Sequence, residues 1–325
     1  MNTRLEDIGF YTLKDERAKN TSETSPLYRC ELILTDACNF NCTYCRGLRK
    51  DIKGTMPVSV VIQTINFWAD NGLKNIRFSG GEATLYKDLP ELIALCKKKN
   101  IERIAISTNG SNKWDYYSKL INLGVNDFSV SLDSCCAAVA ENMAGTKAGM
   151  WDTITQNIKR LSKEVYTTVG CVINEENLNF CLDTIMFADS IGVHDIRVIP
   201  SAQYNQAVEA MKKIPQDILN KYKILNYRYN RAVQGKNVRG MTKSDCKNCW
   251  LVLDDMAVAD KFHFPCIIYM REQGNPIGKI GPDMRKERAT WAREHDCLGD
   301  EICRNNCLDV CVDYNNRCRE YKKGN

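Results

Sequence analysis

The sequence predicts an α/β fold: a partial (β/α)6 barrel followed by a small cysteine-rich C-terminal domain. Between residue 29 and about residue 200, six short apolar runs alternate with amphipathic stretches. Each of the first four apolar runs is followed by a polar motif, and eight of the 17 cysteines lie after residue 245. Strands that alternate with helices form a parallel sheet with right-handed crossovers, and the sites of such sheets lie at the carboxyl ends of the strands.

The expected elements follow from the spacing of apolar residues. Strands are expected at 29–35, 75–82, 103–110, 127–134, 165–174 and 195–200. Helices are expected at 59–72, 89–100, 114–122, 150–162 and 178–191, separating these strands.

Four segments are expected along the chain. Residues 1–28 are an N-terminal extension that is too short to fold alone. The barrel covers 29–200, a helical linker of one or two helices covers 201–240, and the cysteine-rich domain covers 241–325.

Composition narrows the class of protein. The chain has 325 residues, 26% of them charged, and a formal net charge of +5, without stripes of basic residues that would indicate nucleic-acid binding. No apolar run is long enough for a signal peptide or a membrane span, so we expect a cytoplasmic protein. Disulfides are disfavoured in that compartment, so the many cysteines indicate metal binding or catalysis.

The densest motif is C-x3-C-x2-C, formed by Cys38, Cys42 and Cys45 after the first expected strand. Three thiolates on one loop can bind three irons of a [4Fe–4S] cluster and leave the fourth iron open to another ligand. A structural zinc ion normally takes four protein ligands, and this loop holds a single C-x2-C pair. The spacing therefore favours a cluster with an open iron.

Four motifs follow four successive strands: "CNFNCTYC", "SGGE", "STNG" and "SLDS". Their order and positions resemble the radical S-adenosylmethionine (SAM) superfamily from residue 29 to about residue 200. The resemblance implies an iron–sulfur oxidoreductase that binds SAM and a [4Fe–4S] cluster. It implies reductive cleavage of SAM to a 5′-deoxyadenosyl radical, which abstracts a hydrogen from the substrate. An electron donor such as flavodoxin or ferredoxin is then expected.

The resemblance also assigns cofactor contacts. The open iron would bind the amino and carboxylate groups of SAM, with the Gly-Gly-Glu motif at the ammonium. The serine, threonine and asparagine at the end of the third expected strand would contact the carboxylate and ribose of SAM. The serine and aspartate at the end of the fourth strand would contact the ribose. The tyrosine in the cysteine motif would lie near the adenine. The residues are Gly80, Gly81, Glu82, Ser107, Thr108, Asn109, Ser131, Asp133 and Tyr44.

The C-terminal cysteines resemble the SPASM/twitch extension of the superfamily, which carries one or two auxiliary [4Fe–4S] clusters. "GNPIG" at 274–278 strengthens this resemblance, but position 294 is glutamate where the family pattern has cysteine. One cluster is expected on Cys246, Cys249, Cys266 and Cys307, and a second on Cys297, Cys303, Cys311 and Cys318. Zinc, or a single auxiliary cluster, stays open as an alternative.

Three substrates or roles remain open. Modification of a peptide or protein side chain is the main expectation, although the 28 residues before the first strand are expected to be too few for the leader-binding domain that such enzymes often carry. Radical conversion of a small metabolite or nucleotide, as in the GTP-cyclising enzyme of molybdenum-cofactor synthesis, is the alternative. That enzyme's terminal Gly-Gly is missing from the end "KKGN". A non-catalytic iron–sulfur or zinc protein is the third.

Several lesser candidates complete the prediction. The Cys135 thiol could return a hydrogen atom to a substrate radical. Arg46 could contact the cluster or SAM, and Arg197 could meet an anionic group of the substrate. The three histidines show no ligand spacing, and no role is expected for them.

Overall fold

The computed structural model describes residues 16–47, 50–201, 204 and 206–323. The chain divides into two compact units. The first unit contains the described residues up to Ala37, then Gly47–Ala105, and the chain from Arg239 onward. The second unit contains Cys38–Arg46 and Ile106–Val238. The cysteine motif thus belongs to a different unit from the strand that precedes it.

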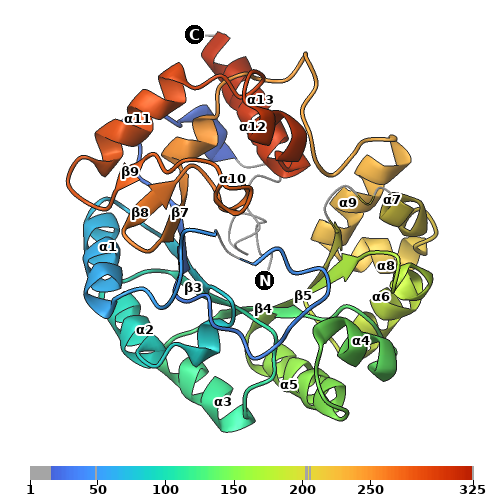
Figure 1. Cartoon of the computed structure of the whole chain (residues 1–325). Helices are drawn as coiled ribbons and strands as arrows, with labels where there is room; N and C mark the ends of the chain where they lie inside the picture. Colours follow the sequence, from blue (N-terminus) through green and yellow to red (C-terminus); the bar gives the residue numbers. More distant parts are fainter. Residues whose placement is uncertain (1–15, 48–49, 202–203, 205, 324–325) are drawn as a thin grey trace. The chain divides into compact units, whose positions relative to one another are not determined.

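The first unit contains a mixed sheet in the order β2-β1-β7-β8-β9, in which β2, β1 and β7 are parallel and β8 and β9 are antiparallel to their neighbours. Although β1 and β7 are far apart in sequence, they lie side by side (Figure 1). The strands are β1 (Arg29–Ile33), β2 (Asn75–Ser79), β7 (Asp255–Ala259), β8 (Phe262–Phe264) and β9 (Gly278–Lys279).

A tight hairpin joins β7 to β8. Ala259 pairs with Phe262, so two residues form the turn, and Asp260 in that turn has φ of 50°. A positive φ suits the two-residue turns that connect antiparallel strands, and aspartate tolerates it better than most residues. Every residue of β7 is buried, which explains why this strand is uniformly apolar between its ends.

Helices of the first unit lie around this sheet. They are α1 (Val58–Asp70), α2 (Leu89–Lys98), α10 (Ile267–Arg271), α11 (Met284–Glu294), α12 (Glu301–Asn306) and α13 (Asp309–Lys323), with 3-10 turns η2 (Glu16–Lys19), η3 (Ala83–Leu85) and η5 (Trp250–Leu253).

A buried arginine ties several of these elements together. Arg288 on α11 is 1% exposed and donates to the carbonyl oxygens of Val252 at 2.8 Å, Phe264 at 3.0 Å and Asp255 at 2.5 Å. These carbonyls belong to η5, β8 and β7. Burial lowers the pKa of the Arg288 guanidinium to about 10, so it remains charged at neutral pH.

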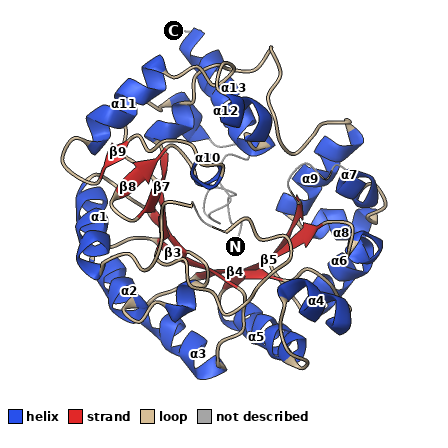
Figure 2. Ribbon diagram, in the orientation of Figure 1, coloured by secondary structure: helices blue, strands red, loops and turns tan. Residues whose placement is uncertain are grey.

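The second unit is built on parallel strands in the order β6-β5-β4. Helices α4, α5 and α6 cover one face of these strands (Figure 2). The strands are β4 (Asp127–Ser131), β5 (Tyr166–Ile173) and β6 (Asp195–Pro200). The helices are α3 (Trp114–Leu123), α4 (Ala137–Ala144), α5 (Met150–Glu164), α6 (Cys181–Ser190), α7 (Gln206–Met211), α8 (Gln216–Lys221) and α9 (Lys223–Val233), with the 3-10 turn η4 (Leu178–Phe180).

A buried carboxylate accepts hydrogen bonds from the first turn of α9. Asp195, at the start of β6, accepts hydrogen bonds from the backbone N–H of Ile224 at 3.0 Å and of Leu225 at 3.4 Å. These N–H groups lie in the first turn of the helix, where a negative charge is favourable. Burial nevertheless raises the pKa of Asp195 to about 6, because the ionised form is poorly solvated there.

The predicted α/β fold is confirmed, with all six expected strands present as β1 to β6; β3 (Arg103–Thr108) crosses from one unit to the other along the chain. Two differences stand out. The stretch 201–240 contains three short helices rather than one or two, and the cysteine-rich region adds three strands that the sequence did not predict. No helix in the described ranges is long and apolar enough to cross a membrane.

Candidate active site

The cysteine loop, residues 38–46, is held against the end of α4 by backbone hydrogen bonds. The N–H of Asn41 donates to the carbonyl of Ala144 at 3.0 Å, and that of Thr43 donates to Met143 at 2.9 Å. Gly145 follows at φ 60°, and a Cβ there would stand 2.9 Å from the Asn41 carbonyl oxygen. Glycine at this position therefore allows the close approach of the two backbones.

The three thiols of this loop remain accessible. Cys38 and Cys45 are exposed and Cys42 is half-buried, with the Cys45 N–H bonded to the Cys42 carbonyl at 3.0 Å in a tight turn. Burial and then the Asp133 carboxylate raise the pKa of the Cys42 thiol to about 11, and the Cys45 and Cys38 thiols add to the effect. Three accessible thiols within electrostatic reach of one another fit a group bound by three thiolates.

Asn109, just beyond β3, meets the first of these cysteines. Its Nδ2 lies 4.0 Å from the Cys38 Sγ and donates to the Asn39 Oδ1 at 2.9 Å. Ser111 completes the arrangement, because its hydroxyl accepts from Asn39 at 2.8 Å and its N–H donates to the Asn109 Oδ1 at 3.0 Å. The amide of Asn109 is thereby fixed beside the cysteine loop.

Tyr44 and Asp133, which the sequence assigned to different parts of SAM, contact each other. The Tyr44 hydroxyl donates to the Asp133 Oδ2 at 2.5 Å, and the Val172 N–H donates to the Oδ1 at 2.9 Å. Burial raises the pKa of Asp133 to about 6, and these two hydrogen bonds oppose that shift. Both carboxylate oxygens therefore have protein donors.

The other polar residues at the strand ends differ in exposure. Ser131 ends β4 and is exposed, whereas Ser107 is half-buried. Thr108 is buried, where its hydroxyl shares a hydrogen bond with the Tyr117 hydroxyl at 3.2 Å and accepts from the Gly110 N–H at 3.1 Å. The Thr108 side chain thus supports the turn after β3.

The Gly-Gly-Glu motif lies in the first unit, against the segment that precedes the cysteine loop. The N–H groups of Gly81 and Glu82 donate to the carbonyls of Thr35 at 2.7 Å and Ala37 at 2.8 Å. A Cβ on Gly81 would stand 2.4 Å from the Ala37 oxygen, and one on Gly80 would stand 2.6 Å from the Thr35 oxygen. The two glycines are therefore required by packing within the protein itself.

Glu82 is buried, with 1% of its surface exposed. Its Oε1 accepts from the Thr84 N–H at 3.0 Å and from the Thr84 hydroxyl at 2.7 Å, which caps η3. These contacts fix the direction of the carboxylate.

The lesser candidates are spread over the second unit. Cys135 is half-buried; its N–H donates to the Thr184 hydroxyl at 3.0 Å, and its thiol is within electrostatic reach of the buried Cys171. The Arg197 Nη2 lies beside β5, 3.6 Å from where a Cβ on Gly170 would stand. Arg46 is exposed on the cysteine loop.

The eight C-terminal cysteines, which we call the thiol field, all lie in the first unit, and most are close together. A hydrogen bond with Cys311, and then burial, raise the pKa of the Cys307 thiol, with Cys249 and Cys266 adding to the rise. Cys246 is within electrostatic reach of Cys249. The field comprises Cys246, Cys249, Cys266, Cys297, Cys303, Cys307, Cys311 and Cys318.

Cys318 has different surroundings from the rest of the thiol field. It is fully buried, and burial raises its pKa to about 12, opposed by a hydrogen bond with Thr21. Thr21 itself bonds the Tyr314 hydroxyl at 2.6 Å. The N-terminal segment thus covers this cysteine.

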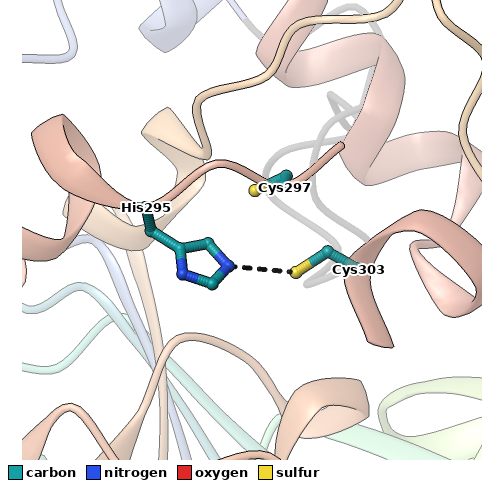
Figure 3. Close-up of side chains that lie close together, drawn as sticks. All are labelled: His295, Cys297 and Cys303. Atoms are coloured by element: carbon teal, nitrogen blue, oxygen red, sulfur yellow. Dashed lines mark hydrogen bonds between the residues drawn. The ribbon is translucent and has the colours of Figure 1, made fainter. Parts of the chain in front are cut away.

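One residue of this region, His295, was not predicted from the sequence. Its imidazole, Cys297 and Cys303 form a group whose ligand atoms all lie within 4.8 Å of one another (Figure 3). The available signal was the position of His295, directly after Glu294, where the resembling family has a cysteine.

Comparison with known proteins identifies the family of residues 32–188. Residues 32–188 match the family model described as the Radical SAM superfamily, and over these residues the chain is a member of that superfamily. The chain therefore contains a Radical SAM domain over residues 32–188. It is an enzyme with a [4Fe–4S] cluster and SAM as cofactors that takes an electron from a reductant and acts on a substrate. The predicted enzyme class and these cofactors are confirmed.

Curated relatives share the name of one activity. The chain is 24% identical over 281 residues to a probable GTP 3′,8-cyclase of Methanococcus maripaludis, covering 78% of this chain and 91% of the relative. It is 36% identical over 107 residues to the GTP 3′,8-cyclase of Tolumonas auensis, which covers 32% of each protein.

Solved structures share the fold at low sequence identity. Streptococcus suis SuiB bound to precursor peptide SuiA has a TM-score of 0.59 at 13% identity, covering 91% of this chain and 77% of SuiB. Native anSMEcpe with bound AdoMet and Cp18Cys peptide has a TM-score of 0.60 at 17% identity, covering 92% and 95%. The likeness extends over most of both chains, which supports the fold assignment.

Proposed function

We propose that this radical SAM enzyme modifies a side chain of a peptide or protein, with its catalytic cluster bound by Cys38, Cys42 and Cys45. The main support is the geometry of the cysteine loop. This loop is hydrogen-bonded to the end of α4, its three thiols are accessible, and the Asn109 amide lies 4.0 Å from the Cys38 Sγ. When bound, the reduced cluster and SAM supply a carbon-centred radical that removes a hydrogen atom from the substrate.

The protein's own residues position SAM in this proposal. The Glu82 carboxylate, fixed by Thr84, pairs with the ammonium of SAM, as a buried carboxylate suits a cation. The exposed Ser131 and the amide of Asn109 offer hydrogen bonds to the ribose and the carboxylate. Asp133 accepts from the ribose through a carboxylate that Tyr44 orients. The backbone around the SAM-binding side chains is formed in part by Ser107, Thr108, Gly80 and Gly81.

We propose one auxiliary [4Fe–4S] cluster in the thiol field, bound by Cys246, Cys249, Cys266 and Cys307. Their thiols are linked by electrostatic contacts in a chain from Cys246 through Cys249 to the other two. The Asn315 Nδ2 lies 3.6 Å from the Cys249 Sγ, and hydrogen bonds of this kind tune cluster potentials. The many free thiols favour a reducing compartment, the cytoplasm, with flavodoxin or ferredoxin as the electron donor.

The solved structures with bound peptides support a peptide substrate. SuiB with a precursor peptide and anSMEcpe with the Cp18Cys peptide match this chain over 91% and 92% of its length, which is more than the barrel alone. A hydrogen donor in the site would fit a redox-neutral reaction, and Cys135 on the loop after β4 is the candidate for that role.

The curated relatives favour a second candidate, radical conversion of a purine nucleotide. The match to the Methanococcus maripaludis protein covers 78% of this chain and 91% of that relative, which is more than the barrel alone.

Isotope transfer decides between the two substrates. The anaerobically purified enzyme is given SAM and dithionite, and 5′-deoxyadenosine is expected from the wild type but not from Cys42→Ala. Deuterium is then sought in 5′-deoxyadenosine after adding short synthetic peptides with deuterated side chains or, separately, GTP deuterated on the ribose. Transfer from a peptide supports the proposal. Transfer from GTP alone would establish the nucleotide reaction instead.

A further inference from the structure

His295, Cys297 and Cys303 form a compact donor set at the junction of α11 and α12. The Cys303 Sγ lies 3.8 Å from the His295 Nε2, and the ligand atoms of all three residues lie within 4.8 Å of one another (Figure 3). Among the residues that the structure describes, no other group of three such side chains is this close. The thiols of the cysteine loop do not meet the same limit, although they belong to one binding loop.

We propose that these three residues bind a single zinc ion, a site separate from the iron–sulfur clusters. Zinc takes sulfur at about 2.3 Å and histidine nitrogen at about 2.0 Å in a tetrahedral arrangement, so its nitrogen and sulfur ligands lie about 3.5 Å apart. The observed separation of 3.8 Å matches that value. The ligands of a [4Fe–4S] cluster bind different iron atoms and must stand farther apart, so the spacing selects one ion.

The imidazole is held in place before any metal binds. Its ring stacks on Trp291 with centroids 4.0 Å apart and an interplanar angle of 15°, and the Tyr269 ring contacts it edge-on. Aromatic contacts on two sides restrict the ring to one orientation. A ligand that is already oriented loses less entropy on binding, which favours a specific metal site.

Asp300 links the histidine to the second cysteine. Its Oδ1 accepts from the Cys303 N–H at 2.8 Å, which caps α12, and its Oδ2 lies 3.5 Å from the His295 Nε2. The Tyr269 hydroxyl donates to the same Oδ2 at 3.0 Å. Asp300 therefore positions Cys303 through the helix cap and places a negative charge beside the nitrogen that would bind the cation.

In this proposal a water molecule is the fourth ligand of the zinc ion. The side chains of His295 and Asp300 are each 19% exposed, so water reaches this side of the group. Two cysteines, one histidine and one exchangeable ligand form a set that tetrahedral zinc accepts. Cys297 is also in hydrogen-bond contact with Cys249, so the zinc site would adjoin the proposed auxiliary cluster without sharing its ligands.

Metal counts on variants test the site. The enzyme is purified anaerobically, reconstituted with iron and sulfide, freed of loose metal, and analysed for zinc and iron by mass spectrometry. We expect about one zinc per chain in the wild type and in His194→Gln, and at least a tenfold loss in His295→Ala and Cys303→Ser with iron unchanged. His194 is a matched control because its imidazole accepts from the Thr167 backbone N–H instead.

Two further measurements keep the test decisive if His295→Ala folds poorly. His295→Cys keeps a zinc ligand at this position and should retain the metal. X-ray absorption at the zinc edge should show nitrogen and sulfur ligands in the wild type and a larger share of sulfur in His295→Cys.

Three outcomes would overturn the zinc site: zinc absent from the wild type, zinc kept in His295→Ala, or zinc replaced on reconstitution by about four additional irons per chain. A separate variant tests the proposed auxiliary cluster. Cys249→Ser should lower iron and leave zinc unchanged, so a variant that loses no iron contradicts the cluster and not the zinc site.

Discussion

At the scale of single residues, two adjacent glycines let one loop lie directly against another. The backbone of Gly80 and Gly81 packs on the carbonyls of Thr35 and Ala37, leaving no space for a side chain. The sequence predicted close backbone approach at this motif, but it could not identify the partner. That partner is the segment that leads into the cysteine loop, so the motif fixes the backbone directly before Cys38, the first proposed cluster ligand.

Gly81→Ala should therefore destabilise the protein and weaken cluster binding. Its Cβ would stand 2.4 Å from the Ala37 oxygen, which is backbone and cannot move aside cheaply. We expect a loss of about 2–4 kcal/mol in the free energy of unfolding. Urea unfolding measures it. Gly281→Ala is the matched control, since that glycine has open space around it and should change nothing.

Asp195 makes a second prediction, on pH. Its pKa is raised to about 6 in the folded protein, so between about pH 4 and pH 6 the folded state binds more protons than the unfolded state. The stability contribution of Asp195 is thus present at low pH and falls as the pH rises through 6, by about 2–3 kcal/mol. Urea unfolding at about pH 4.5 and pH 7.5 measures the difference in the free energy of unfolding between the two pH values. The contribution of Asp195 to that difference should vanish in Asp195→Asn and persist in the exposed control Asp183→Asn.

At the scale of elements, the C-terminal region is held by side chains that reach between short elements. Arg288 bonds η5, β7 and β8 from a single position on α11. Cys266 and Asp300 each accept a backbone N–H at the start of a short helix. Such small elements bury little apolar surface, so these polar links carry much of their order.

Replacing the central arginine should loosen all of these elements. Arg288→Met keeps much of the volume but leaves the carbonyls of Val252, Asp255 and Phe264 buried without their donor. A cost of about 3–5 kcal/mol is expected. Thermal unfolding followed by circular dichroism measures the effect. Lys286→Met, at an exposed position of the same helix, should melt like the wild type. A variant of Arg288 that melts normally would contradict the proposed link.

At the scale of the whole molecule, strands and motifs were predictable, whereas long-range partners were not. Six strands and the cysteine loop followed from local periodicity and spacing. The pairing of β7 with β1 joins segments more than 200 residues apart, and the short apolar run of β7 carries no signal of its partner. The contact of Tyr44 with Asp133 depends on the same kind of distant pairing. His295 and Cys303 are eight residues apart, but their contact depends on how the chain turns between α11 and α12, which the spacing of apolar residues does not predict.

The division into two compact units predicts independent metal loading. The cysteine loop belongs to one unit and the thiol field to the other. The triple variant Cys38→Ala, Cys42→Ala, Cys45→Ala should therefore lose about four irons per chain and retain the iron of the auxiliary cluster. Iron analysis and electron paramagnetic resonance of the reduced protein measure how much cluster iron the variant retains. Complete loss of iron would contradict independent loading, provided that the variant remains folded by circular dichroism.

The docking of the cysteine loop on the end of α4 also sets an order of events during synthesis. Asn41 and Thr43 bond the carbonyls of Ala144 and Met143, which leave the ribosome about 100 residues later. At ordinary rates of translation the three thiols wait on the order of ten seconds for the surface that fixes them. Cluster delivery to a correctly shaped loop must follow that interval, so any nascent chain stalled before residue 145 presents bare thiols to passing metal ions.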